Sequence, residues 1–166
     1  MPTTGISEYG FHYQMTRTIR KSWDAHTQYS MPSCFSKWLF YGPFVTSVFK
    51  EGSGLVLGVS LHSWSVKVWQ ATHARDLSAY PVAGHGMKYV TTINGVPWES
   101  WLQRWANDYI SVSRDPNTRF NEAVDPYFEG GPFTMYELMP EGNVTLAFND
   151  STVEVDSLVV RSDWTM

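Results

Sequence analysis

The segment "KYVTTINGVPWESWLQRWANDYI" at residues 88–110 constrains the fold more than any other part of the chain. Asn94-Gly95 is a favoured dipeptide of the type I′ turn, because both residues adopt positive φ angles at low cost. The segment therefore predicts two short strands joined by a tight turn and followed by a helix. In that helix the apolar residues fall on one face, at helical spacing: Trp98, Trp101, Leu102, Trp105, Ala106 and Tyr109.

The remaining patterns predict a mixture of helices and strands. Residues 7–23 predict a helix that begins at Ser7 and carries an apolar stripe of Phe11, Met15, Ile19 and Trp23. A second short helix is predicted after Asp115-Pro116, since proline favours the first position of a helix. Strands are predicted where β-branched and aromatic residues gather, at residues 44–50, 55–61, 65–71, 133–139, 143–149 and 151–162.

These elements predict an α+β chain with about six strands, two short helices and one N-terminal helix. Strands and helices do not alternate as they do in a doubly wound parallel sheet. The 166 residues fall within the roughly 100–200 that are typical of one domain. The apolar fraction of 43% supplies a core.

Composition excludes several classes of function. The net charge of −4 and the single short basic run "RTIRK" argue against a nucleic-acid partner, because phosphates require a basic surface. No apolar run approaches the roughly 20 residues of a membrane span. No phosphate-binding glycine motif occurs, so no cofactor is expected. The sequence assigns no compartment, and two N-glycosylation triplets at 143–145 and 149–151 favour secretion only slightly.

Few residues have the spacing of a reactive site. The five histidines do not show a zinc-binding spacing, and Cys34 is the single cysteine, so no metal site is expected. No serine lies in the frame of a nucleophile elbow. What remains is "WDAHTQY" at 23–29, in which Asp24 and His26 follow the predicted helix. A histidine there acts as a general base if a nucleophile comes within about 3 Å.

The chain also resembles a known family in five segments that occur in the same order. "WDAHTQYSMPSCFSKWLFYGPFVTSVF" resembles the stretch leading into the PDZ-like domain of eukaryotic, often fungal, proteins. These proteins are similar to the chlamydial protease-like activity factor, in the tail-specific clan of serine peptidases. The matching segments are Trp23–Tyr29, Cys34–Pro43, Val90–Pro97, Ser113–Ala123 and Gly131–Pro140. Trp23 departs from the family, which usually has asparagine there.

The resemblance implies a division into an N-terminal helical segment, 1–36, and a PDZ-like domain, 37–166, that forms a partly open barrel or sandwich. It implies that His26 is the general base of a serine peptidase. Asp24, two residues before His26, is a candidate orienting group for that base. The serine belongs to a later peptidase domain that the 166 residues lack, so the chain alone is expected to be inactive.

Two hypotheses of function follow. In the first, the chain is the N-terminal part of a serine peptidase, and its partners are a polypeptide substrate and the missing peptidase domain. In the second, it is a stand-alone PDZ-like module that binds the C-terminal peptide of another protein. The loop Tyr41, Gly42, Pro43 and Phe44 is the candidate site for the peptide carboxylate, with a simple turn as the alternative. A homodimer is a further candidate assembly.

Overall fold

The computed structural model describes residues 5–36, 38–41, 44–61, 67, 87–124, 135–136, 144–155 and 158–161. These residues form four helices and ten strands. The helices are α1 (Glu8–Arg20), α2 (Ser33–Ser36), α4 (Trp98–Tyr109) and α5 (Pro116–Val124). The strands are β1 (Trp38–Tyr41), β2 (Phe44–Glu51), β3 (Gly54–Leu61), β4 (Lys88–Val90), β5 (Thr92–Ile93), β6 (Val96–Pro97), β7 (Met135–Tyr136), β8 (Val144–Ala147), β9 (Thr152–Val155) and β10 (Leu158–Arg161).

The strands pair into three antiparallel sheets, with the orders β10-β1-β7, β2-β3-β4 and β6-β5-β8-β9. Within the described residues no sheet closes on itself, so the α+β class with a partly open sheet is confirmed. The strands are more numerous than the sequence predicts, and β2 and β3 are each one residue longer than their predicted ranges. The predicted strand 65–71 is wrong at its one described residue, Lys67, which is helical, and its other residues lie outside the described ones. Of the predicted strand 133–139 only β7 is described.

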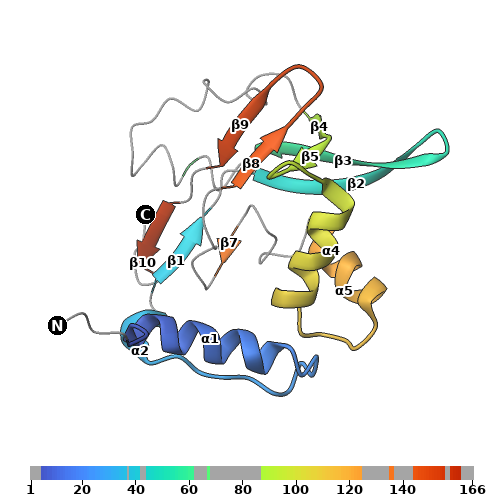
Figure 1. Cartoon of the computed structure of the whole chain (residues 1–166). Coiled ribbons are helices and arrows are strands. Elements are labelled where there is room, and N and C mark those ends of the chain that lie inside the picture. Colours follow the sequence, from blue (N-terminus) through green and yellow to red (C-terminus); the bar gives the residue numbers. More distant parts are fainter. Residues whose placement is uncertain are drawn as a thin grey trace.

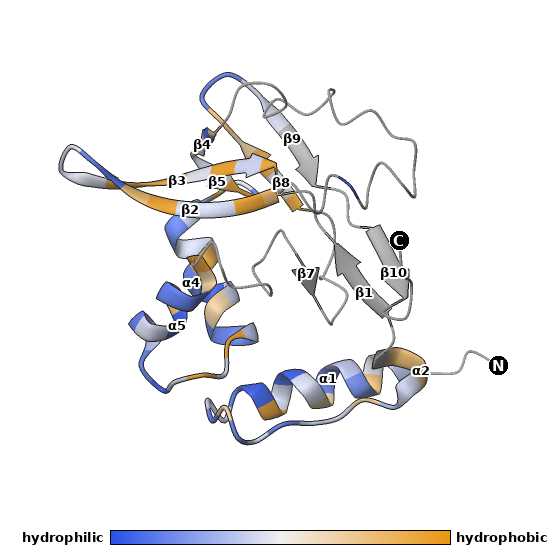
Figure 2. Ribbon diagram, turned by 180° about the vertical axis from the view of Figure 1, so that it is seen from behind, coloured by the Kyte–Doolittle hydropathy of each residue, from blue (hydrophilic) through white to orange (hydrophobic). Residues whose placement is uncertain are grey.

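Local sequence signals account for the most regular elements. The hairpin of β2 and β3 pairs Phe44 with Leu61 and ends in the turn that the sequence predicts. Asn94 and Gly95 have φ angles of 51° and 73°, so the predicted type I′ conformation joins β5 to β6. Figure 2 shows apolar residues concentrated on β2 and β3, and polar residues at the tip of their hairpin.

The core lies between α4 and the two sheets that contain β3 and β8. Helix α4 buries the face that its apolar spacing predicts, and this face includes the fully buried Leu102. The buried residues of this cluster are Phe44, Leu57, Val59, Val90, Ile93, Trp98, Leu102, Val144, Leu146 and Phe148. A smaller cluster of Ala106, Ile110 and Ala123 joins α4 to α5.

Helix α1 packs through a different face from the predicted one. Ser7 caps the helix through its side chain, as expected, but the buried residues are Tyr13 and Thr16. Phe11 of the predicted apolar stripe is 47% exposed, and Trp23 lies beyond the end of the helix. Met15 and Ile19 of the predicted stripe are half-buried, so the prediction is wrong at Phe11 and Trp23. The surface of α4 that α1 contacts includes the polar groups of Asp108 and Tyr109. Figure 1 shows α1 beneath α4 and α5.

The last predicted strand, 151–162, is divided into β9 and β10. The two strands belong to different sheets, because β9 pairs with β8 whereas β10 pairs with β1. The chain thus passes from one sheet to another within this segment.

Candidate functional site

The candidate site is the turn that follows α1, from Trp23 to Thr27. The helix tightens at its end, where the backbone N–H groups of Ser22 and Trp23 donate to the backbone oxygens of Ile19 and Arg20, three residues earlier. Trp23 then adopts a φ angle of 52°. This left-handed conformation costs a bulky residue roughly 1–2 kcal/mol, so contacts of Trp23 must hold it there. The conformation of Trp23 sets the direction in which the chain leaves α1.

Asp24 organises the turn through its carboxylate. Oδ1 accepts a hydrogen bond from the backbone N–H of His26 at 3.0 Å, and Oδ2 accepts one from the hydroxyl of Thr27 at 2.9 Å. The backbone N–H of His26, followed by the Thr27 hydroxyl, lowers the pKa of Asp24 below its usual value of 3.8. Asp24 is therefore ionised at neutral pH, and the local pattern is that of an aspartate turn.

The same carboxylate contacts the ring of His26. Asp24 Oδ1 lies 3.3 Å from Nδ1 of His26, and the histidine side chain is 97% exposed. Because an ionised carboxylate only accepts hydrogen bonds, this contact requires the proton on Nδ1 when the ring is neutral. Nε2 is then an acceptor that faces solvent, which is the state of a general base before its nucleophile arrives.

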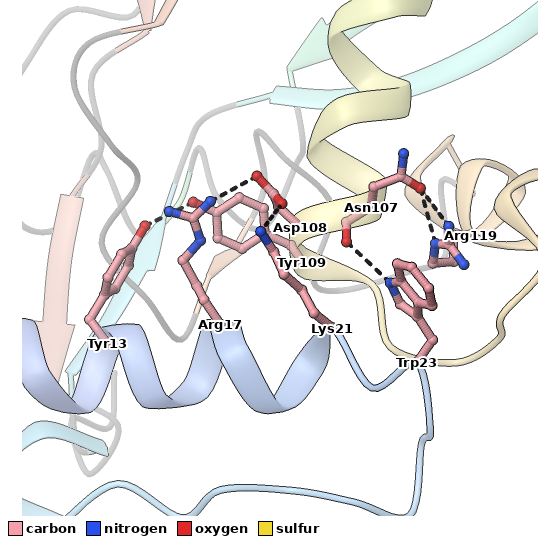
Figure 3. Close-up of polar contacts among 8 residues, drawn as sticks. All are labelled: Tyr13, Arg17, Lys21, Trp23, Asn107, Asp108, Tyr109 and Arg119. Carbon is pink, nitrogen blue, oxygen red and sulfur yellow. Dashed lines mark hydrogen bonds and ion pairs between the residues drawn. The ribbon is translucent and has the colours of Figure 1, made fainter.

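Trp23 attaches this turn to α4 and α5. Its indole N–H donates to the backbone oxygen of Asn107 at 3.4 Å, and its ring lies beneath the guanidinium of Arg119, 4.5 Å from Cζ to the ring centroid. Figure 3 shows these contacts beside the end of α1. The two residues that contact Trp23 come from α4 and α5, so Trp23 attaches the turn to helices of the predicted domain 37–166.

Arg119 is buried and held by neutral oxygens. Its Nε and Nη2 donate to Oδ1 of Asn107 at 3.1 and 2.6 Å, and its Nη1 donates to the backbone oxygen of Ser113 at 2.7 Å. Only 3% of the residue is exposed. Neither Arg119 nor Asn107 is predicted from the sequence to belong to the site, because a charged or amide residue on an amphipathic helix predicts a solvent-facing position.

Helix α1 itself is fixed to α4 by a polar contact. Arg17 and Lys21 both pair with Asp108, at 2.7 and 2.8 Å, and the hydroxyl groups of Tyr13 and Tyr109 lie 2.8 Å apart. The guanidinium of Arg17 also lies over both tyrosine rings (Figure 3). The helix and the turn after it are therefore attached to α4 at successive points.

The structure describes only part of the predicted peptide loop. Tyr41 ends β1, where it pairs with Leu158 and Met135, and Phe44 begins β2. Gly42 and Pro43 lie outside the described residues. Phe44 is fully buried in the core, so this residue can offer a peptide only its backbone. A carboxylate site at this loop stays a prediction.

The described ends of this loop, where β1 ends and β2 begins, do not lie beside the turn that carries His26. In Figure 1 the turn lies at the end of α1 away from α2, and the connection of residues 21–32 runs back along the helix. Strand β1 begins near α2 and runs away from α1. The histidine and the predicted peptide loop are thus two separate features.

The other candidate residues form no reactive cluster in the described part of the chain. His12 Nδ1 lies 2.5 Å from the hydroxyl of Tyr29 and its ring stacks on that of Tyr29, which holds the returning connection against α1. Cys34 is exposed and has a free thiol. Among the described residues no group of three or more histidine, cysteine, aspartate or glutamate side chains is placed to hold a metal. No described helix is long and apolar enough to cross a membrane.

Comparison of the chain with protein-family models, with curated proteins and with solved structures found no match.

Proposed function

We propose that the chain is the N-terminal and PDZ-like portion of a serine-type peptidase of the tail-specific clan, and that it contributes the general base His26. The observation that carries the proposal is the pairing of a solvent-facing histidine with an ionised carboxylate at its Nδ1. Its anchorage on α4 through Trp23 adds support, since a base is useful only at a fixed position.

The proposed chemistry is acyl transfer. A serine hydroxyl on a peptidase domain approaches Nε2 of His26 and transfers its proton there as its oxygen attacks the peptide carbonyl. The Asp24 carboxylate stabilises the imidazolium that forms, and His26 later returns the proton to the leaving amine. Because the members of such a site act as a unit, His26 without a serine performs no hydrolysis.

The first test asks whether a nucleophile exists. The purified 166-residue chain should remain unlabelled by a serine-reactive fluorophosphonate probe. The reading frame downstream of residue 166 should encode a serine-bearing domain, and the longer protein should be labelled. Labelling of the short chain, or a downstream sequence without such a domain, would contradict the proposal.

The second test asks whether His26 is the base. In the longer protein, His26→Ala should reduce peptide hydrolysis by about 10³-fold or more. Gln28→Ala is the matched control, because Gln28 is an exposed polar residue of the same turn. Equal activities of the two variants would remove His26 from the mechanism.

A second candidate function is a stand-alone PDZ-like module that binds peptides. The observation in its favour is that β2 is an outer strand in the order β2-β3-β4, and that in the described residues its other edge has no strand partner. An extended peptide adds to such an edge by main-chain hydrogen bonds. A peptide library with free C-termini should then bind the short chain, and amidation of the termini should abolish binding. Absence of binding would exclude the module.

A further inference from the structure

Two residues link the Asp24–Thr27 turn to other elements in the described contacts. Trp23 precedes the turn and contacts α4 and α5, and Tyr29 follows it and contacts His12 of α1. The turn's other hydrogen bonds lie within residues 24–28, where they shape the turn but do not place it. Trp23 stands directly before Asp24, and its left-handed φ angle decides where the turn points. The contacts of the indole ring therefore help to set the position of His26 from the side of α4 and α5, while Tyr29 holds the chain after the turn against α1.

The ring is held by a residue that has little freedom of its own. Arg119 is almost fully buried, and three hydrogen bonds to Asn107 and Ser113 fix the plane of its guanidinium. The face of an indole ring carries partial negative charge and is the best aromatic partner for a cation. Since the hydrogen bonds of Arg119 go to neutral oxygens, the ring face adds an electrostatic partner for a buried charge.

Asn107 connects the two contacts. Its side-chain oxygen accepts from Arg119, and its backbone oxygen accepts from the indole N–H of Trp23 (Figure 3). The geometry at Trp23 is therefore set jointly by the C-terminal part of α4 and by α5. The hydrogen bond from Trp23 to Asn107 is long, at 3.4 Å, and therefore weak. The stacking of the ring on the guanidinium of Arg119, 4.5 Å from Cζ to the ring centroid, therefore contributes more to fixing the position of the ring.

We propose that Arg119 is a positioning residue for His26, acting through the ring of Trp23. This inference rests on the proposed role of His26 as a general base, and it adds that α5 of the PDZ-like domain sets the location of that base. A serine brought by another domain meets Nε2 only if the turn is already in place, and a misplacement of about 1 Å costs an enzyme up to about 10²-fold in rate. Trp23 and Arg119 thus connect the PDZ-like domain to catalysis without touching the substrate.

The test uses the 166-residue chain and NMR of the turn. Trp23→Ala removes the ring, whereas Trp23→Phe keeps an aromatic face for Arg119 and removes the N–H donor. In the unmodified chain the backbone order parameters of residues 24–28 should be near 0.85, about the value of rigid backbone, and in Trp23→Ala they should fall below about 0.6. Trp23→Phe should stay close to the unmodified chain. If Trp23→Phe is as mobile as Trp23→Ala, the stacking on Arg119 does not position the turn and the proposal fails.

A second readout reports on the His26 ring itself. The ¹⁵N shifts of the ring nitrogens distinguish the Nδ1–H form, which contact with Asp24 selects, from the Nε2–H form. Because that contact lies within the turn, the Nδ1–H fraction should be the same in Trp23→Ala, in Trp23→Phe and in the unmodified chain, while the order parameters of residues 24–28 differ. A fall of the fraction in Trp23→Ala would overturn the proposal, because Trp23 would then shape the turn itself and not only its position.

Arg119→Gln tests the cation directly, with Arg114→Gln as the control. Arg114 is an exposed arginine that precedes the N-cap of α5. Arg119→Gln should loosen residues 24–28 and Arg114→Gln should not; equal effects would contradict a specific role. If Arg119→Gln fails to fold, the comparison of Trp23→Ala with Trp23→Phe tests the proposal. Because these measurements require no hydrolysis, failure of the positioning is separable from failure of the peptidase role, which the His26→Ala assay detects.

Discussion

Replacement of Arg17 by alanine should detach α1 from α4 more than any other single change at that contact. Arg17 pairs with Asp108 at 2.7 Å, its side chain is only 21% exposed, and its guanidinium lies 5.8 and 5.5 Å from the rings of Tyr13 and Tyr109. Lys21 reaches the same carboxylate at 2.8 Å, but its side chain is 50% exposed. The two cations therefore share one partner and differ in burial and in ring contacts, which makes them a matched pair.

The magnitude follows from these contacts. A partly buried ion pair near the surface contributes about 0.5–1 kcal/mol, and each cation–ring contact contributes about 0.5–1 kcal/mol. Arg17→Ala should therefore reduce the free energy of unfolding by about 2 kcal/mol. Lys21→Ala should cost less than about 0.5 kcal/mol, because solvent screens an exposed pair. In a double-mutant cycle, Arg17 and Asp108 should show a coupling energy of about 1 kcal/mol.

Urea unfolding followed by circular dichroism measures the free energies, and amide hydrogen exchange locates the change. Exchange in α1 should accelerate in Arg17→Ala, while exchange in the β2–β3 hairpin should stay as it is. A difference of less than about 0.5 kcal/mol between Arg17→Ala and Lys21→Ala would refute the reasoning, because burial and ring contacts would then contribute nothing.

Three further predictions concern the core, a turn and a cap. Leu102→Ala should cost about 3 kcal/mol in urea unfolding, because the residue is fully buried in α4, and the exposed Glu99→Ala should stay within about 0.5 kcal/mol. Gly95→Ala should cost about 1 kcal/mol in thermal unfolding, since φ is 73° there; no loss would mean that the turn relaxes. The Thr118 hydroxyl and backbone N–H groups lower the pKa of Asp115 below 3.8, so its stabilisation is complete above that value and is lost as the pH falls through the folded-state pKa. Asp115→Asn keeps a capping side chain but removes the carboxyl group that titrates. Between about pH 7 and about pH 2 the urea midpoint of this variant should therefore fall less than that of the unmodified chain. An equal fall in the two proteins would contradict the prediction.

The sequence predicts those elements whose signals are local. The hairpin of β2 and β3, the turn at Asn94-Gly95, helix α4 and the start of α5 at Asp115-Pro116 all depend on neighbouring residues, and the structure contains each of them. Local spacing does not predict the buried face of α1, because its partner on α4 is polar and lies far away in the sequence. The division of residues 151–162 between two sheets depends in the same way on distant partners.

The residues of the candidate site likewise differ in whether the local sequence predicts them. Asp24 and His26 lie two residues apart, and their contact is that of a local turn, so the sequence is enough to single them out. Arg119 joins the turn only through tertiary packing, and its burial contradicts the usual solvent-facing position of an arginine. A single sequence carries no signal for such a contact.

The pairing of β1 with β10 has a consequence for how the chain folds. β1 follows the N-terminal helices closely, but its partner β10 lies beyond every other strand. Bringing such distant segments together has a high loop-closure entropy, and contacts of this kind form late and slow the folding rate. The contact of α1 with α4 also joins distant segments, since Tyr13 and Tyr109 lie 96 residues apart in the sequence. We therefore expect this contact to form late as well, so that the turn with His26 reaches its place only when the distant contacts of the chain have formed.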